Sequence, residues 1–178
     1  VISLAPLPVD YLDLGWLTTD GASFAREVSQ SDVSSWGSNT PTRTDITADT
    51  TSLTLAAQET NLLSLSLGTG IDPLGITADP DTGEVSIEKP DTPAQRSYRA
   101  LAVAVDSYEG QEIYLARFLP SAKVTNYAEQ AFGGGDDPIT WGVTLTAEKD
   151  STLGYTERWI FGGPGWFAQL AAMGIEVS

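Results

Sequence analysis

The fold class of this chain is decided by the stretch ITWGVTLTA, residues 139–147. Its apolar side chains occupy one parity: Ile139, Trp141, Val143, Leu145 and Ala147. Its polar or small residues occupy the other: Thr140, Gly142, Thr144 and Thr146. A period of two indicates a strand with one buried face. The turn-rich residues 149–154 separate it from the run 155–161, so we predict a hairpin between the two runs.

Three further segments are predicted as strands from the spacing of their apolar residues. The pattern of Ser52–Glu59 alternates cleanly, and that of Gln111–Leu119 alternates less cleanly. Tyr98–Asp106 differs, because branched apolar residues fill one parity and alanines fill the other. A strand that is apolar on both sides is typical of one covered on both faces. We therefore predict that Tyr98–Asp106 is central in its sheet.

Glycine-containing stretches predict where the chain turns. Asp20-Gly21 lies between two short apolar runs, which favours a hairpin there. The stretch DPDTG, residues 79–83, predicts the turn of another hairpin, and it lacks the further oxygen ligands and the two helices of an EF-hand calcium loop. Residues 133–138, GGGDDP, predict a flexible loop rather than a phosphate site, because two carboxylates follow the glycines and no Gly-Lys-Ser/Thr ending does.

Two segments are candidates for helices. The first begins after a cap at Thr60 and runs to Leu67, with Gly68 at its C-terminal end, although its alternating leucines fit a strand equally well. The second is Trp166–Met173, which ends at Gly174 in the same way. The remaining apolar segments are short and rich in turn residues, so we predict a mainly β fold.

Composition excludes several classes of function. The chain has 24 Asp and Glu, 9 Lys and Arg, and neither His nor Cys, giving a formal charge of −15 at pH 7. Such a surface repels nucleic-acid phosphates. The absent residue types remove the usual general base, thiolate nucleophiles and zinc ligands. Only carboxylate chemistry remains, as in a glycosidase, and no carboxylate pair can be nominated for it. We predict no catalytic residues, no metal and no cofactor.

The overall hydrophobic content predicts one soluble globular domain over residues 1–178. Hydrophobic residues make up 41% of the sequence, which is enough for a core at this length. The longest obvious apolar run, Ala100–Val105, ends at Asp106 and is far shorter than the roughly 20 residues that cross a bilayer. We therefore expect no membrane insertion.

Five tryptophans allow two interpretations. Exposed indole rings on an acidic β-sandwich are typical of carbohydrate-binding modules. The interpretation we favour assigns four of them to the core or to interfaces: Trp16, Trp141, Trp159 and Trp166. Trp36, between Ser35 and Gly37, is predicted to be exposed.

Several segments, in order along the chain, resemble the major tail proteins of long-tailed, non-contractile bacteriophages of the siphovirus type, particularly those of actinobacterial hosts. The matching segments are Leu14–Gly21, Ser31–Trp36, Arg43–Asp45, Ala57–Asn61 and residues 139–166. Residues 71–93 match least well. The resemblance covers most of the chain, and none of its segments is as specific as a metal or nucleotide signature.

This resemblance implies a structural virion protein. Such a subunit is a β-sandwich or partial barrel of antiparallel strands, with one flanking α-helix, long hairpins, an N-terminal arm (about 1–13) and a C-terminal segment (about 162–178). Six copies form a ring, and rings stack into a hollow tail tube through which DNA is delivered without specific binding. The implied partners are further copies of the chain and other tail components such as the tape measure, terminator and distal tail proteins. The protein would be made in the host cytoplasm and reside in the phage tail.

Within such a tube, the polar parity of residues 139–147 can face a wet channel while the apolar parity faces the core. The candidate lumen-facing residues are Thr140, Thr144, Thr146, Glu148 and Asp150. In the alternative interpretation the two carboxylates are ordinary solvated groups on an outer rim, with Glu148 paired to Arg158. The rival functions are a carbohydrate-binding or adhesin module and a carboxylate-only glycosidase.

Overall fold

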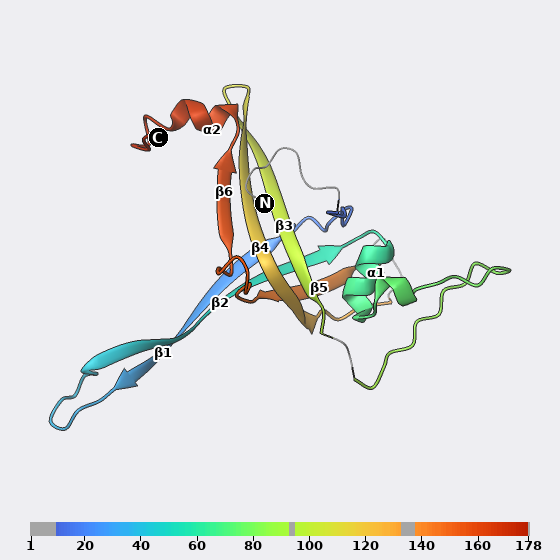
Figure 1. Cartoon of the computed structure of the whole chain (residues 1–178), viewed down its shortest axis with the longest axis horizontal. Helices are drawn as coiled ribbons and strands as arrows, with labels where there is room; N and C mark the ends of the chain where they lie inside the picture. Colours follow the sequence, from blue (N-terminus) through green and yellow to red (C-terminus); the bar gives the residue numbers. More distant parts are fainter. Residues whose placement is uncertain (1–9, 93–94, 133–137, 178) are drawn as a thin grey trace. The chain divides into compact units, whose positions relative to one another are not determined.

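The computed structural model describes residues 10–92, 95–132 and 138–177 (Figure 1). These residues form six strands, two α-helices and one short 3-10 helix. The strands are β1 Ser23–Val33, β2 Arg43–Ala57, β3 Ser97–Tyr108, β4 Gln111–Tyr127, β5 Trp141–Ala147 and β6 Arg158–Gly162. The helices are α1 Leu62–Thr69, η1 Pro73–Gly75 and α2 Pro164–Gln169.

The strands belong to one antiparallel sheet with the order β1-β2-β5-β4-β3, and β6 pairs separately with β4. The prediction of a mainly β, antiparallel fold is confirmed, and helix α1 packs against β5. The β-sandwich or partial-barrel shape stays a prediction. The predicted hairpin between 139–147 and 155–161 is wrong, because β5 lies between β2 and β4 while β6 pairs with β4.

The chain forms two compact units. Unit 1 comprises Val1–Asp13, Ser97–Ala122 and Glu148–Ser178; unit 2 comprises Leu14–Arg96 and Lys123–Ala147. Strand β4 contributes residues to both. The single domain with its two terminal segments stays a prediction. Residues 1–9 of the predicted arm and 133–137 of the predicted Gly-rich loop lie outside the described residues.

The core of unit 2 is built where β2 and β5 pair. Leu53 lies opposite Leu145, and both side chains are buried. Val143 is buried as well, so the period-two pattern of residues 139–147 placed the inward face correctly. Residues 52–57 of the predicted strand 52–59 lie within β2, which ends at Ala57. Gly142 is required at its position, since a Cβ there would lie 2.6 Å from the Cβ of Ala128.

Helix α1 begins after Asn61 rather than Thr60. The Asn61 Oδ1 atom accepts the Ser64 N–H at 2.9 Å, while Ser64 Oγ accepts the Asn61 N–H at 2.8 Å, which forms a capping box. The helix runs through Gly68 and ends before Gly70, whose φ of 73° is left-handed. Helix α2, in contrast, begins earlier than predicted, because Pro164 suits a first helical turn, and it ends at Gln169.

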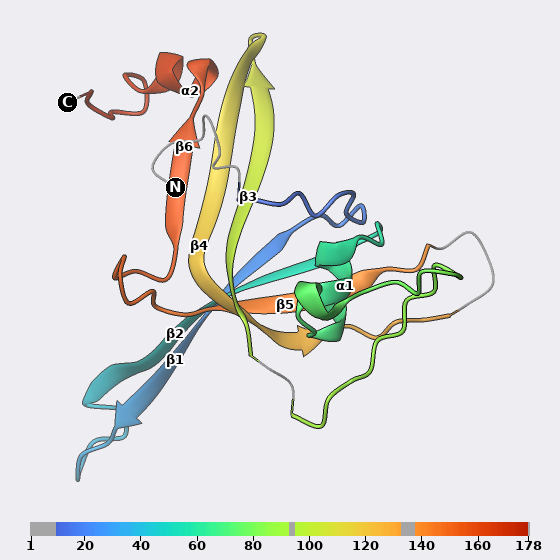
Figure 2. The same cartoon turned by 45° about the vertical axis from the view of Figure 1, so that its right-hand side comes forward.

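The β1–β2 hairpin of unit 2 extends away from β5 and α1 (Figures 1 and 2). Ten of the eleven β1 residues are exposed, so the distal part of the hairpin adds little to the core. The predicted hairpin at Asp20-Gly21 is wrong. Its turn exists, with Gly21 N–H donating to the Thr18 carbonyl at 2.8 Å, but both flanking runs pair with β2, Leu17 with Ala57 and Ser23 with Thr54.

The turn predicted at residues 79–83 is confirmed. Asp79 Oδ1 accepts the N–H groups of Asp81 and Thr82 at 2.9 and 2.8 Å, and Gly83 has a φ of 72°. The two amide donors lower the pKa of the Asp79 carboxyl, that of Thr82 more than that of Asp81. Its side chain is thus committed to the turn. The hairpin predicted around this turn is wrong, because a single bridge between Ala78 and Val85 closes it and the described residues form no strand on either side.

Unit 1 contains the β3–β4 hairpin, β6 and α2. Its buried side chains include Ala116, Phe118 and Leu119 of β4. Arg117 lies between the first two in the sequence. Strand β6 pairs with β4 so that Phe161 lies opposite Leu115. The prediction that Tyr98–Asp106 is a central strand is wrong, because β3 is the last strand in the sheet order.

Candidate assembly surfaces

A row of threonine hydroxyls crosses three strands of unit 2. Thr144 of β5 lies opposite Thr54 of β2, and their Oγ1 atoms are 3.0 Å apart. Thr146 of β5 shares a hydrogen bond of 2.7 Å with Thr125 of β4. The row therefore presents hydroxyl groups rather than charges. Two of its members were candidate lumen residues from the sequence, and the other two were missed because only the strand register brings them into line.

The other candidate lumen residues are arranged differently. Thr140 precedes β5, and its carbonyl accepts a hydrogen bond from the Gln130 side chain at 3.3 Å. Glu148 and Asp150 belong to unit 1, whereas the threonines belong to unit 2. The backbone N–H of Glu148 donates to the Ser121 carbonyl at 2.8 Å, and its side chain is exposed.

Asp150 is a turn residue. Its Oδ1 accepts the N–H groups of Leu153 and Thr152 at 2.7 and 2.8 Å. These two bonds, that of Leu153 first, lower the pKa of the Asp150 carboxyl. The carboxylate thus has a local role in fixing the turn that precedes Tyr155, whatever else it faces.

Three of the five tryptophans are exposed in the single chain, and the assignment of Trp16 and Trp159 to interfaces stays a prediction. Trp36 is fully exposed, as expected, with a relative exposure of 104%. Trp16 and Trp159 are 77% and 53% exposed, so neither is a core residue of the isolated chain. Trp141 is half-buried, and its Nε1–H donates to Thr60 Oγ1 at 3.0 Å.

An aromatic row runs along β6 into α2 in unit 1. The ring centroids of Trp159 and Phe161 are 6.4 Å apart, and those of Phe161 and Trp166 are 4.8 Å apart. The Arg117 guanidinium carbon lies 4.1 Å from the Trp159 ring centroid. Its Nε donates to Glu157 Oε1 at 2.5 Å. Only 15% and 11% of these two charged side chains is exposed, so the ion pair anchors the base of the row.

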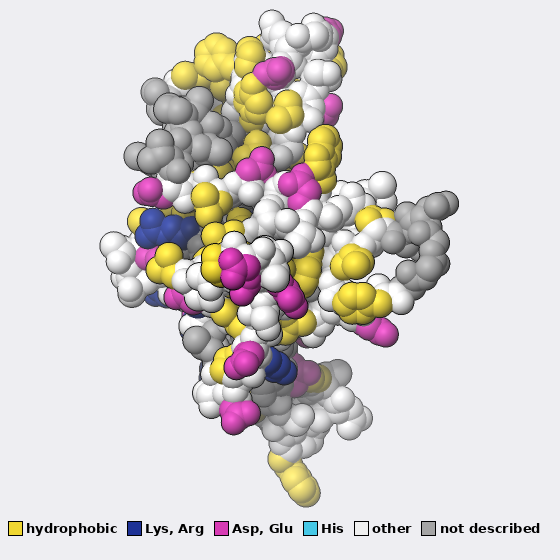
Figure 3. Space-filling model, turned by 90° about the vertical axis from the view of Figure 1, so that its right-hand side faces the viewer, with side chains coloured by type: hydrophobic (Ala, Val, Ile, Leu, Met, Phe, Trp, Pro, Cys, Tyr) yellow, Lys and Arg dark blue, Asp and Glu magenta, His cyan; other side chains and the backbone are white. Residues whose placement is uncertain are grey.

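The surface is acidic and carries exposed apolar side chains in both units. Among the described residues, Val28 and Ile46 of unit 2 and Val105 and Phe161 of unit 1 are exposed. Figure 3 shows one face, on which Asp and Glu side chains are scattered widely and Lys and Arg are few. Exposure is greatest along β1, where ten of eleven residues are exposed.

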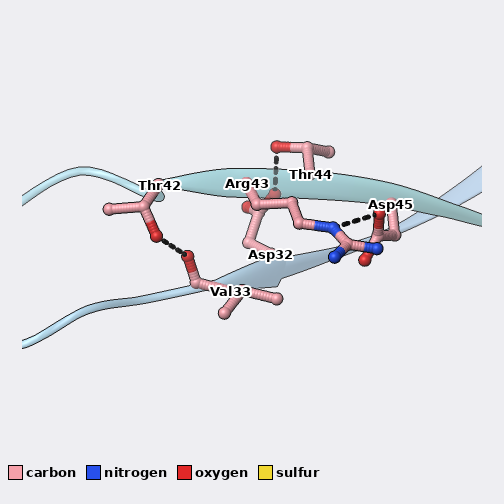
Figure 4. A network of polar contacts seen from close by, with 6 residues as sticks. All are labelled: Asp32, Val33, Thr42, Arg43, Thr44 and Asp45. Atoms are coloured by element: carbon pink, nitrogen blue, oxygen red, sulfur yellow. Dashed lines mark hydrogen bonds and ion pairs between the residues drawn. The ribbon is translucent and has the colours of Figure 1, made fainter.

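Polar contacts hold the distal hairpin in shape (Figure 4). Thr42 Oγ1 donates to the Val33 carbonyl at 3.1 Å, and Thr44 Oγ1 donates to Asp32 Oδ1 at 2.8 Å. Arg43 pairs with Asp45 on the same strand. The apolar side chains of the hairpin take no part in these polar contacts. Val28, Val33, Trp36 and Ile46 are all exposed.

Two comparisons with known proteins found no match. No protein-family model matches the chain, and no curated protein sequence matches it. Across the described residues, no helix has the length and apolarity needed to span a membrane. In the same residues, no group of three or more acidic side chains gathers closely enough to hold a metal ion.

Proposed function

We propose that this chain is the subunit of a non-contractile phage tail tube. In this role it forms hexameric rings that stack into a hollow conduit for DNA, in contact with tape measure, terminator and distal tail proteins. The proposal begins from the sequence resemblance to major tail proteins. The mainly β, antiparallel fold with a flanking helix and a long hairpin is compatible with it.

One observation carries the proposal furthest: large hydrophobic side chains are exposed in both units, among them Val28 and Ile46 of the β1–β2 hairpin and Val105 and Trp159 of unit 1. Exposed apolar side chains that gather on a surface typically mark a surface that a partner covers. A subunit in a ring and in a stack has several such surfaces. The projecting β1–β2 hairpin, with fully exposed Trp36 near its tip, supplies part of such a surface.

The chemistry of unit 2 suits a conduit for a polyanion. The row of Thr54, Thr144, Thr146 and Thr125 offers uncharged hydroxyl groups and no cation to a phosphate. A net charge of −15 repels DNA as a whole. A wall of this kind lets DNA slide without being retained.

Assembly is the direct test. The purified chain is examined by sedimentation velocity over a wide range of concentration and by negative-stain microscopy. Rings or hollow tubes are expected. A chain that remains monomeric up to millimolar concentration would contradict the proposal.

The contribution of the hairpin is tested with two exposed residues of unit 2. Trp36→Ala removes the indole near the tip, and Leu74→Ala removes a 90% exposed side chain from η1 as a control. If the hairpin makes contacts between subunits, only Trp36→Ala raises the concentration at which tubes form. Equal behaviour of the two variants would assign those contacts to another part of the chain.

A channel role for Glu148 is tested in phage particles. Glu148→Lys introduces a cation without disturbing the Asp150 turn, and tubes are expected to form normally. Slower DNA release would support a position in the lumen, and unchanged release would place Glu148 elsewhere.

The exposure of Trp36 and Trp159 favours carbohydrate binding as the second candidate function. A monomer that binds a polysaccharide, and loses that binding in Trp36→Ala or Trp159→Ala, would establish it in place of the tube.

A further inference from the structure

The outer edge of β3 is an unprotected strand edge. Strand β3 ends the sheet order in the described chain, and it is twelve residues long. Natural proteins usually protect such edges with lysine, proline, bulges or short strands. The middle of β3, Ala100–Val105, contains six successive uncharged residues and none of these devices.

Strand β1, at the opposite end of the sheet order, is protected. It carries three charged side chains, Arg26, Glu27 and Asp32. Its ladder with β2 is interrupted by a register shift between Ser29 and Gln30. The two ends of one sheet thus differ in the features that prevent strand pairing, which points to β3 as the edge that pairs.

The side chains of β3 indicate the same conclusion. Its branched apolar residues and its alanines give it apolar character on both parities, a composition typical of strands covered on both sides. In the isolated chain, however, Val103 and Val105 are 44% and 61% exposed. A strand that continues the sheet beyond β3 would give these side chains cross-strand neighbours on the side that now has none among the described residues.

Charge favours a second copy of this chain as the occupant. Copies that each carry −15 repel one another wherever their carboxylates meet. Strand β3 has one cation, Arg99, and one anion, Asp106, so two copies in contact along it add no net repulsion.

We infer that the outer edge of β3 pairs, through main-chain hydrogen bonds, with a strand of a second copy and so extends the sheet from one subunit to the next. This inference rests on the proposed function in one respect, that the chain assembles with itself. It adds the strand through which it does so.

The test compares lysine at two equally exposed valines. Val103→Lys charges the middle of β3, and Val85→Lys charges a residue that is also 44% exposed but lies beside the turn at residues 79–83. Lysine reduces the net negative charge, so a loss of assembly cannot arise from added repulsion. Val105→Lys, at a 61% exposed position, is a second β3 variant that keeps the test valid if Val103→Lys misfolds. Circular dichroism checks the fold of all three.

Sedimentation velocity and hydrogen exchange then separate the outcomes. We expect Val103→Lys and Val105→Lys to raise the concentration for half-assembly at least about tenfold, since a charge must be desolvated in the new ladder, and Val85→Lys to match the wild type. In the wild type, β3 amides should gain protection only in the assembled fraction. If the wild type assembles and all three variants assemble equally well, the inference about β3 is overturned while the tube proposal stands. A wild type that never assembles overturns both.

Discussion

Replacing Glu157 with Gln removes the charge of one partner in a nearly enclosed ion pair. Glu157 Oε1 lies 2.5 Å from Arg117 Nε, and the two side chains are 11% and 15% exposed. The Arg117 guanidinium also lies over the Trp159 ring. The variant therefore keeps the shape of the site, and the stacked guanidinium loses the carboxylate that balances its charge.

The expected cost follows from this geometry. Removing one partner of a buried pair costs about 3–5 kcal/mol. The neutral hydrogen bond that Gln retains is worth about 1 kcal/mol, and stacking on Trp159 still stabilises the cation. We therefore expect a loss of about 2–3 kcal/mol in the free energy of unfolding. For a chain of this length, that corresponds to a fall in Tm of about 4–12 °C.

The assay is thermal and urea unfolding of Glu157→Gln beside Asp49→Asn. Asp49 pairs with Arg26 at 2.5 Å, but those side chains are 43% and 65% exposed, so solvent screens the pair and no resolvable change is expected. Equal and small effects in both variants would show that the Arg117–Glu157 pair is no more than a surface contact, and the argument from enclosure would fail.

Three further predictions concern local structure. Gly68→Ala would place a Cβ 2.6 Å from Cε3 of the Trp141 ring and should cost about 1–3 kcal/mol in urea unfolding, whereas Gly75→Ala, with nothing within 4 Å, should be neutral. Asn61→Ala removes the α1 cap and should lower the free energy of unfolding by about 1 kcal/mol in the same assay. An unchanged urea midpoint would show that the cap does not stabilise the protein. The folded pKa of Asp150 lies below its unfolded value of about 3.9, so its stabilisation is present above that pH and is lost as pH falls through the folded pKa. Asp150→Asn should therefore flatten the acid side of the stability–pH profile, and an unaltered profile would contradict this.

Local patterns predicted the strands well and their partners poorly. The inward face of residues 141–147 was correct because alternation depends only on successive residues. The pairing of β6 with β4, rather than with β5, joins segments distant in the sequence, which no local pattern encodes. The position of β3 at the end of the sheet order was mispredicted for the same reason.

The boundaries of α1 show how tertiary contacts choose between adjacent candidates. Thr60 and Asn61 are both competent caps, but the Thr60 hydroxyl accepts the Trp141 indole N–H, and Asn61 caps the helix. Gly68 resembles a helix end in sequence, yet it lies within α1, where the Trp141 ring leaves no room for a Cβ. In the row of threonine hydroxyls, Thr54 and Thr125 could be identified only from the register of three strands.

The register shift in the β1–β2 hairpin has a consequence for how this protein can change. Ser29 pairs with Ala48 and Gln30 with Ile46, so Thr47 is a supernumerary residue on β2. It reverses the phase of the strand, and Ile46 thereby shares a face with Val28 although the two-residue period of β2 alone would assign it to the other side. A ladder in which Thr47 took its turn opposite Gln30 would rotate residues 43–46 to the opposite face. A one-residue insertion between Ser29 and Gln30 that pairs with Thr47 would therefore turn the tip of this hairpin over and leave the buried side chains of β2 in place, whereas deletion of Thr47 would keep Ile46 on the face of Val28.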